Sequence, residues 1–334
     1  MGPLVQAGLV MSLEPYDDLY RWSDEISEGA LGSSRMSDDG KTMGAGTLYG
    51  LPYAGQLNGI YYNRAKVEAL GIDTNFESMA DLTAALKTAT DAGETAVMLG
   101  NLDGDPAKSA WEQLLGSFVD KQLMRDVVQG KPGTNLVTDE AAASVALIQD
   151  WANKGYFYEG YAGTSRADGD ALFAKGVGVF DINNTQLLGS YAAGLGSDLG
   201  FTLVPREKAG DAAQASGATA QPFCISSKSK SPDVAASFLN FVAQPDNAQT
   251  LWDGGLIPLL GADSVSSELP VENDVLKAWQ TVSDADGLTW YLGWATTSFQ
   301  SVEMPNLQEV LAGRMQPKAF LESLQANWAE TYGN

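Results

Sequence analysis

The hydrophobic and polar positions of this chain switch between a helical period of about 3.6 residues and short apolar runs, which predicts alternating helices and strands. The clearest helix is predicted between Ser78 and Gly93, because Ser78 and Asp81 can cap its first turn and glycine favours a helix end. Its apolar stripe consists of Leu82, Ala85, Leu86 and Ala89. Alternation of this kind indicates α/β layers.

Further elements are predicted along the rest of the chain. One helix is expected between Thr138 and Gly155, and residues 304–332 are expected to form two helices divided at 313–317. Another helix opens at Pro232, and its expected core-facing side chains are Val234, Phe238, Phe241 and Val242. Buried strands are predicted at 95–99, 176–182 and 200–204. The tryptophans expected to pack between helices are Trp22, Trp151, Trp279 and Trp328.

The segment 49–63, YGLPYAGQLNGIYYN, combines aromatic, small and amide residues before a helix-like run. Its proline and glycines discourage a long helix and favour an extended, twisted segment. Tyr53 lies near the amides Gln56 and Asn58, and an aromatic face beside neutral donors and acceptors is the surface that a pyranose ring needs. The alternative interpretation is a buried strand whose tyrosines belong to the core.

Several short motifs accompany this segment in a fixed order. They are Gly40-Lys41, Tyr49-Gly50-Leu51-Pro52-Tyr53, Tyr62-Asn63, residues 173–180 (FAKGVGVF), 229–239 (SKSPDVAASFL), 252–258 (WDGGLIP) and 307–317 (LQEVLAGRMQP). In this order, over residues 7–330, the chain resembles family 1 extracellular solute-binding proteins, the sugar-capturing subunits of bacterial ABC importers. One difference is the insertion TMGAGTL between Lys41 and Tyr49.

The resemblance implies a two-lobed periplasmic-binding-protein-like α/β fold of type II with a hinge between the lobes. The first lobe would contain residues 1–63 and 206–265. The second would contain residues 64–205 and 266–334, with the C-terminal helices packed across it. The crossings near Asn63 and Pro205 would be hinge strands.

The start of the chain differs from the usual pattern of the family. Members usually have a signal peptide and a βαβ unit before the segment that aligns with residues 7–10 (AGLV). We therefore expect an incomplete first lobe that is less stable than the second, with uncovered apolar faces that favour association. The residues at the start of this sequence lack the basic region and long apolar run of a signal peptide, and they lack a lipobox cysteine.

Composition excludes several classes of function. The formal net charge of −22 argues against binding to nucleic acid or anionic lipid, since both require basic patches. The chain contains no histidine, which removes Ser-His-Asp and Cys-His catalysis and His-ligated zinc. The single cysteine, Cys224, cannot form an intrachain disulfide and is expected in a buried strand. We expect no metal ion and no cofactor.

Other candidate ligand contacts come from the positions that match the family. Trp111 could stack on a sugar or pack in the core. Asn183 and Asn184 stand where relatives often have tryptophan, so hydrogen bonding would replace stacking there. The small residues around Gly217 and Ala218 would let the backbone approach the ligand, or they are a plain connecting loop. The densest aromatic cluster, expected to supply at least one contact, consists of Trp290, Tyr291 and Trp294.

The resemblance implies a binding protein rather than an enzyme. It would capture a mono- or oligosaccharide between the lobes by aromatic stacking and neutral hydrogen bonds, close about the hinge and deliver the sugar to a permease. We expect a monomer outside the cytoplasm, in the periplasm or as a cell-surface lipoprotein. The alternatives are a glycoside hydrolase or lyase with a carboxylate pair, and a carbohydrate sensor or adhesin without transport.

Overall fold

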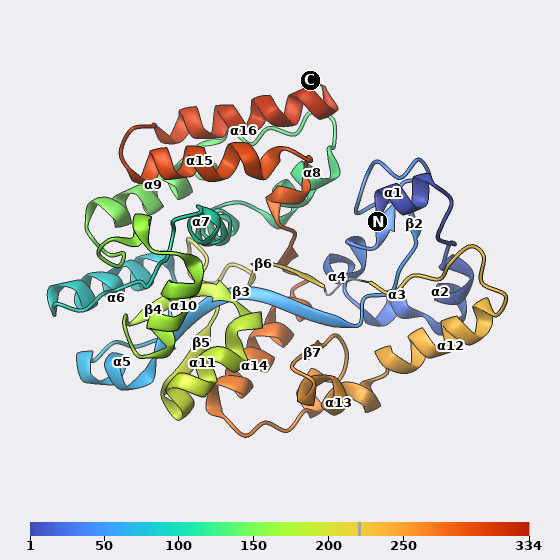
Figure 1. Cartoon of the computed structure of the whole chain (residues 1–334), viewed down its shortest axis with the longest axis horizontal. Coiled ribbons are helices and arrows are strands. Elements are labelled where there is room, and N and C mark those ends of the chain that lie inside the picture. The colour runs from blue at the N-terminus through green and yellow to red at the C-terminus, as the bar shows by residue number, and fades with distance from the viewer. Residues whose placement is uncertain (220–221, 334) are drawn as a thin grey trace.

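The computed structural model describes residues 1–219 and 222–333, which form a smaller and a larger lobe (Figure 1). The smaller lobe has its own core, which includes Leu13, Trp22, Leu48 and Ile225. Its elements are α1 (Gly2–Gln6), α2 (Glu14–Tyr20), α3 (Trp22–Glu25), α4 (Glu28–Gly32), β1 (Arg35–Met36), β2 (Thr47–Leu48) and α12 (Pro232–Ala243).

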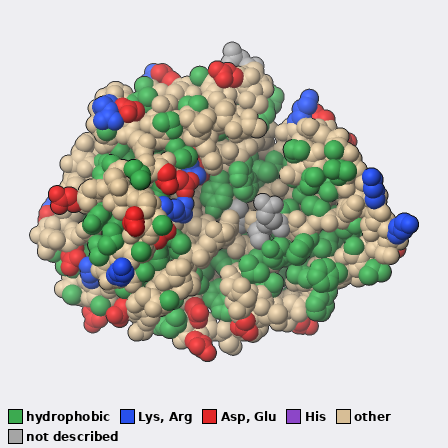
Figure 2. Space-filling view, viewed as in Figure 1, with side chains coloured by type: hydrophobic (Ala, Val, Ile, Leu, Met, Phe, Trp, Pro, Cys, Tyr) green, Lys and Arg blue, Asp and Glu red, His purple; other side chains and the backbone are tan. Residues whose placement is uncertain are grey.

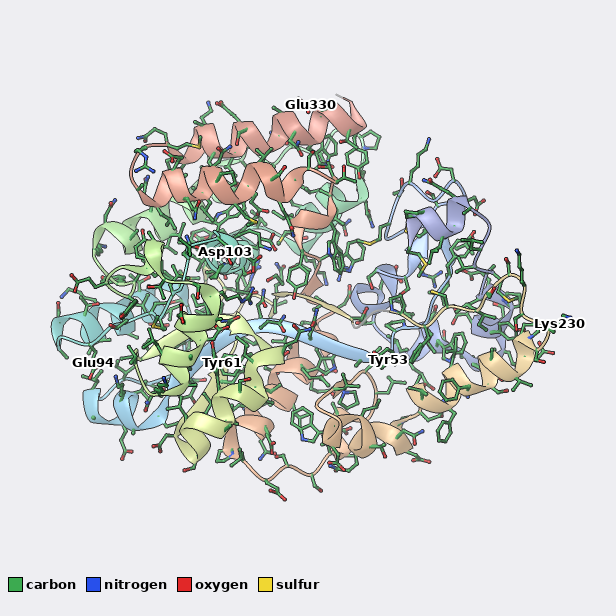
Figure 3. All side chains as sticks on the ribbon, in the orientation of Figure 1. Tyr53, Tyr61, Glu94, Asp103, Lys230 and Glu330 are labelled. Carbon is green, nitrogen blue, oxygen red and sulfur yellow. The ribbon has the colours of Figure 1, made fainter. Side chains whose placement is uncertain are left out.

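The larger lobe is built around one long strand, β3 (Ala54–Asn63). The second half of β3 pairs antiparallel with β4 (Phe180–Asn184) and β5 (Leu199–Thr202), and its first half with β6 (Ala215–Thr219) and β7 (Ile257–Pro258). The short strand β8 (Leu288–Thr289) extends the sheet parallel to β6. In Figure 3, Tyr61 labels the part of β3 near its last residue, inside the larger lobe. Tyr53 labels the residue just before the first residue of β3.

Both faces of this sheet are buried because successive side chains of a strand point to opposite sides. Ile60 and Tyr62 belong to a large core cluster, while Leu57 and Tyr61 belong to a second one. The helices that supply the first cluster are α5 (Arg64–Leu70), α6 (Met79–Asp91), α7 (Asp105–Phe118), α8 (Lys121–Gln129), α9 (Asp139–Asn153), α15 (Phe299–Leu311) and α16 (Pro317–Tyr332). Those around the second are α10 (Arg166–Ala174), α11 (Leu188–Leu195), α13 (Ala248–Asp253) and α14 (Pro270–Asp284).

Glycines permit close packing at two points of β3. A Cβ atom at Gly55 would lie 2.1 Å from the ring of Trp279, and one at Gly59 would lie 2.3 Å from Phe201. Only glycine lets these aromatic rings lie directly on the strand. Short one-turn helices complete the chain: η1 (Tyr161–Gly163), η2 (Thr185–Leu187), η3 (Gly196–Asp198), η4 (Pro245–Asn247), η5 (Ala262–Ser264) and η6 (Leu292–Trp294).

The predicted helices with strong end signals are confirmed. Ser78 and Asp81 form the capping box of α6, Thr138 accepts the backbone N–H of Ala141 at 3.1 Å, and α15 and α16 divide where predicted. The four tryptophans expected between helices are all buried. Residues 96–99 are buried and the run 95–99 has backbone hydrogen bonds to its neighbours, but within it only Val97 forms β-bridges. The strand predicted at 176–182 begins at Phe180 because Gly176 and Gly178 adopt positive φ.

The predicted orientation of α12 is wrong. Its inner face carries Ala236, Leu239 and Ala243, whereas Val234, Phe238 and Phe241 are 70, 56 and 60% exposed. The helix is apolar on more than one side, so its pattern did not define a single core face. The prediction for Cys224 is also wrong in part, since its segment forms only isolated bridges, at Phe223 and Ser226, and the thiol is half-buried.

None of the helices within residues 1–219 and 222–333 combines the length and hydrophobicity required to cross a lipid bilayer.

Candidate functional site

A cleft of about 800 Å³ is lined by residues from both lobes. Figure 2 shows the central hollow, with hydrophobic side chains gathered in and below it. This volume suits a small organic ligand, for which pockets of roughly 300–1,000 Å³ are typical. The lining residues are Met1, Leu4, Ser33, Met43, Tyr53, Ala54, Gly55, Gln56, Thr185, Gln186, Thr219, Pro222, Cys224, Gly255, Leu256, Ile257 and Trp294.

Polar contacts in the cleft are made by amides and hydroxyls. The side-chain amide of Gln186, on η2, donates a hydrogen bond to the side-chain oxygen of Gln56 on β3. Ser33 of the smaller lobe and Thr219 of β6 share a hydrogen bond of 2.9 Å between their hydroxyl groups. These groups can both donate and accept, which matches the hydroxyl groups of a neutral polar ligand.

Aromatic and aliphatic side chains supply the apolar part of the cleft. The ring of Tyr53 is stacked on Phe223 with 4.5 Å between centroids. Trp294 is 41% exposed and packs edge-on against Tyr291. An exposed indole face of this kind can stack on the C–H face of a sugar ring.

The described lining of the cleft contains no Asp, Glu, Lys or Arg. This neutrality contrasts with a chain whose formal net charge is −22. A charged ligand would lose its hydration there without gaining a counter-charge among these residues. The lining therefore favours a neutral ligand.

Three predicted aromatic contacts lie away from the cleft. Trp111 is fully buried, where its indole N–H donates to Ser144 at 3.1 Å and its ring meets Phe320 edge-on, so the core alternative holds. Trp290 is also buried and packs between the lobes. The hydroxyl of Tyr291 accepts a hydrogen bond of 2.9 Å from Asn184. Burial raises the pKa of Tyr291. Trp294 is therefore the member of the predicted cluster that lines the cleft.

The predicted amides Asn58, Asn183 and Asn184 form networks beside the cleft rather than lining it. Asn58 donates to the hydroxyl of Ser216 at 3.0 Å and accepts from Asn184 at 3.1 Å. Asn183 is buried, where its amide oxygen accepts a hydrogen bond from Arg166 at 3.1 Å. These bonds hold β3, β4 and β6 in register near the cleft.

The two small residues predicted on β6 are committed to the sheet. Gly217 pairs with Leu57, and a Cβ atom on Gly217 would lie 2.5 Å from the carbonyl oxygen of Gln56. The close approach that requires glycine is therefore to β3. Ala218 pairs with Gln56 through its backbone, and its side chain lies outside what the structure describes.

Sequence reasoning found Tyr53, Gln56 and Trp294 among the lining residues and missed several others. Gln186 and Thr185 follow the Asn183-Asn184 pair, so the local run of polar residues was the available signal. The remaining missed residues include Ser33, Met43 and Thr219. They are distant in sequence: the pairing of β3 with β6 places Thr219 beside Gly55, and Ser33 reaches Thr219 from the end of α4.

The buried carboxyl groups of the protein are elsewhere. Burial raises the pKa of Asp181 to about 7, and the hydroxyl of Tyr191 donates a hydrogen bond to this carboxyl group. Glu112 and Glu303 are buried between α7 and α15. None of these three residues is part of the described cleft lining. Within the described ranges, no His, Cys, Asp or Glu side chains are grouped so that three could hold a metal ion.

Comparison with known families identifies the fold. Residues 1–290 match the family described as bacterial extracellular solute-binding protein. The chain belongs to this family. The family resemblance predicted from the motifs is thus confirmed, and no curated protein gives a significant sequence match.

Solved structures of solute-binding proteins share the fold at low sequence identity. A chitin oligosaccharide binding protein has a TM-score of 0.77 and 18% identity, covering 99% of this chain and 81% of its own. The apo form of RafE from Streptococcus pneumoniae has a TM-score of 0.77 and 16% sequence identity, and the match covers 99% of this chain and 81% of RafE. The solute receptor AcbH is described as preferring β-D-galactopyranose. It has a TM-score of 0.76 and 14% sequence identity, and the match covers 100% of this chain and 83% of AcbH. These matches confirm the predicted two-lobed solute-binding fold, while the predicted lobe boundaries remain a prediction.

Proposed function

We propose that this protein is a carbohydrate-binding receptor that captures its ligand in the cleft between the lobes. The observation that carries this proposal is the cleft lining, in which the exposed indole of Trp294 and the ring of Tyr53 accompany neutral amides and hydroxyls. A pyranose has an apolar C–H face and a rim of hydroxyl groups, so such a lining meets both. The solved relatives are described as binding chitin oligosaccharide, raffinose and galactopyranose, which supports a sugar here.

The proposed mechanism is capture and delivery. The ligand would contact both lobes, favour their closed arrangement and be passed to the permease of an ABC importer. The family is bacterial and extracellular, which supports a location outside the cytoplasm. We propose that the protein acts as a monomer and that Gln56, Gln186 and Trp294 make the main contacts.

A glycoside hydrolase is less well supported. That chemistry needs two carboxyl groups beside the scissile bond, roughly 5–9.5 Å apart. The described lining residues of the cleft supply none. The relatives found by family and structure comparison are binding proteins.

A screen of neutral mono- and oligosaccharides by thermal shift tests the proposal. A ligand that binds only the native protein raises the melting temperature, by an amount that grows with its concentration above Kd. We expect at least one neutral sugar to do so, and the shift at the same sugar concentration should be smaller in Trp294→Ala. A complete panel without any shift would contradict the proposal, and shifts that are unchanged in Trp294→Ala would show that Trp294 is not a main contact.

A further inference from the structure

Trp290 is a buried side chain that joins the two lobes. Its indole N–H donates a hydrogen bond of 2.8 Å to the carbonyl oxygen of Gly29 on α4. Its ring fills a slot between two glycines of the smaller lobe. A Cβ atom at Gly32 would lie 2.5 Å from this ring, and one at Gly44 would lie 2.4 Å from it. Any larger residue at these two positions would force the tryptophan to move.

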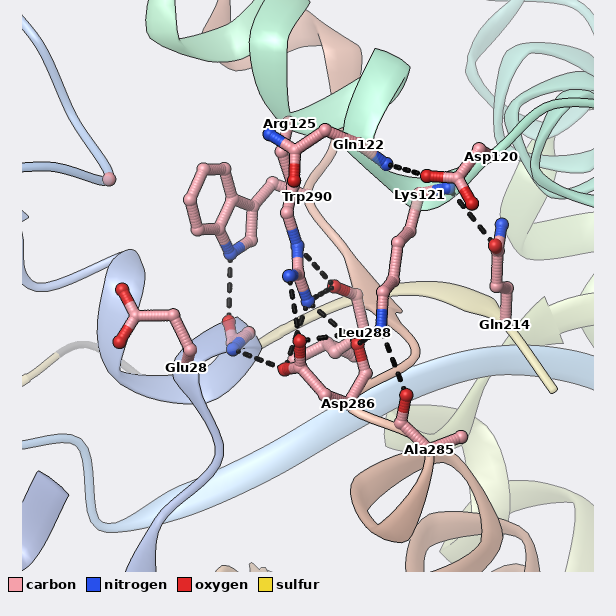
Figure 4. Close-up of polar contacts among 12 residues, drawn as sticks. Glu28, Asp120, Lys121, Gln122, Arg125, Gln214, Ala285, Asp286, Leu288 and Trp290 are labelled. Atoms are coloured by element: carbon pink, nitrogen blue, oxygen red, sulfur yellow. Dashed lines mark hydrogen bonds and ion pairs between the residues drawn. The ribbon is translucent and has the colours of Figure 1, made fainter. Parts of the chain in front are cut away.

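A polar cluster surrounds this tryptophan, as Figure 4 shows. The guanidinium of Arg125 on α8 donates to the carboxylate of Asp286 at 2.9 Å and to the carbonyl oxygen of Leu288 at 2.9 Å, and it lies over the Trp290 ring. Lys121 donates to the carbonyl oxygens of Ala285 and Asp286, each at 2.9 Å. On the other side, the backbone N–H of Gly29 donates to Asp286 at 2.9 Å.

Asp286 is therefore a shared acceptor between the lobes. Burial alone would raise its pKa, but the hydrogen bonds and charges of Arg125, Gly29 and Lys121 outweigh this effect and lower it. Asp286 also has φ of 44°, a left-handed conformation that is uncommon outside glycine. Residues held in such a conformation need support from their surroundings, and the cluster provides it.

The two sides of this contact belong to different cores. Ala30 and Leu31, next to Gly29 on α4, lie in the core of the smaller lobe. Met124 and Val127 of α8 lie with Trp290 in the large core of the other lobe. A second link lies further along α8, where the amide of Gln129 donates to the carbonyl oxygen of Gly44 at 3.1 Å.

The contact is close to a residue of the cleft along the chain. The end of β6 pairs with the start of β3, and β8 pairs with Ala215 and Ser216 at the other end of β6. Trp290 follows β8 directly, and Trp294 lines the cleft four residues later. Along the chain, Trp290 thus lies between β8 and a residue of the cleft.

We propose that a clasp fixes the angle between the two lobes. It consists of Trp290, Arg125, Asp286 and the two facing glycines, Gly32 and Gly44. Rotation of one lobe against the other would have to withdraw the indole from its slot or break the bonds to Gly29. The clasp therefore restricts the lobes to a narrow range of angles. Weakening it widens that range and shifts the equilibrium toward other arrangements.

The test measures the distance between the lobes without any ligand, so its result does not depend on whether the protein binds a sugar. Spin labels are attached to Lys230→Cys and Glu330→Cys in a Cys224→Ser background, and distances are measured by electron–electron double resonance. Lys230 and Glu330 are exposed and lie on the smaller lobe and on α16 (Figure 3). The parent should give one narrow distance distribution.

Gly32→Ala is the wedge variant, because its new methyl group meets the indole. Gly189→Ala, on α11, is the matched control, since a Cβ atom there has no neighbour within 4 Å. We expect Gly32→Ala to broaden and shift the distribution while Gly189→Ala leaves it unchanged. Gln129→Met removes only the outer hydrogen bond and should give a smaller broadening in a protein that folds normally. If Gly32→Ala fails to fold, the distance distribution of Gln129→Met tests the proposal instead, and a broadening relative to the parent supports it. Folded variants with the parent distribution would overturn the proposal.

Discussion

The carboxyl groups of Glu112 and Glu303 lie together in the core between α7 and α15, fully buried and without a well-placed hydrogen-bond donor in the described structure. Burial raises the pKa of Glu112 from 4.5 to about 7, although the positive charge of Lys108 works in the opposite direction. Burial and the neighbouring charge of Glu112 raise the pKa of Glu303 well above its ordinary value. The folded protein therefore retains protons that the unfolded chain releases.

This pair predicts that stability falls as pH rises. The unfolded chain loses the Glu112 proton near pH 4.5, whereas the folded protein loses it near pH 7. The stabilisation that protonated Glu112 contributes is therefore complete below pH 4.5 and is lost as the pH rises to about 7. In Glu112→Gln the part of this loss that comes from Glu112 should disappear, while the part that comes from the burial of Glu303 remains. Over this window the variant should gain on the parent by up to about 1.4 kcal/mol per pH unit. Urea unfolding at a series of pH values measures the difference.

A matched control for this experiment is Glu68→Gln, because Glu68 is exposed on α5. It should leave the pH dependence of the parent unchanged. Identical pH profiles for Glu112→Gln and Glu68→Gln would show that the buried pair has no effect on stability.

Trp294 and Trp290 should give opposite phenotypes although they lie four residues apart. Trp294→Ala removes an exposed face from the cleft and should weaken sugar binding by about 1–3 kcal/mol with little loss of stability. Trp290→Phe, which loses the hydrogen bond to Gly29, should lower the melting temperature instead. Calorimetric titration and thermal unfolding separate the two effects. Unchanged affinity in Trp294→Ala would remove it from the binding site.

The sugar that binds should not be consumed. Because the described lining of the cleft has no carboxyl group, neither a general acid nor a nucleophile is available beside the ligand. An oligosaccharide identified by thermal shift should stay intact during prolonged incubation, as measured by chromatography and a reducing-end assay. Continuous release of reducing ends that scales with protein concentration would show that the protein is an enzyme.

The exposed aromatic face of α12 should cause weak association at high concentration. Phe238 is 56% exposed, and the centroid of its ring lies 6.3 Å from that of Phe223. Further hydrophobic side chains lie on the surface of this region in Figure 2. Phe238→Lys should reduce association measured by sedimentation equilibrium. Leu102→Lys is the control, since Leu102 is equally exposed but lies in the loop before α7. Equal association of both variants would exclude this face.

Local signals in the sequence were sufficient for the helices with clear ends. The cap formed by Ser78 and Asp81, and the glycine at 93, act within one turn of the chain, so they can be recognised without the fold. Helix α12 lacks such a constraint on its orientation, because apolar residues surround most of it. Which of its faces is covered depends on the smaller lobe as a whole.

The cleft could be predicted only in part for a related reason. The aromatic cluster at 290–294 was recognisable, but its sequence does not tell which ring faces the ligand. Trp290 is buried because Gly32 and Gly44, about 250 residues earlier, leave a slot for it. Likewise, Gln186 meets Gln56 across 130 positions of sequence. Contacts of this range follow from strand pairing, which residue patterns alone do not fix.

We expect strand β3 to make the larger lobe unfold as a single unit. It pairs with β4, β5, β6 and β7, and its side chains enter both clusters of the larger lobe. Once β3 separates, each of these partners loses its neighbour at the same time. Slow amide exchange should therefore have one common rate limit from Leu57 to Tyr62, and fragments of the larger lobe without this strand should fail to persist as folded pieces.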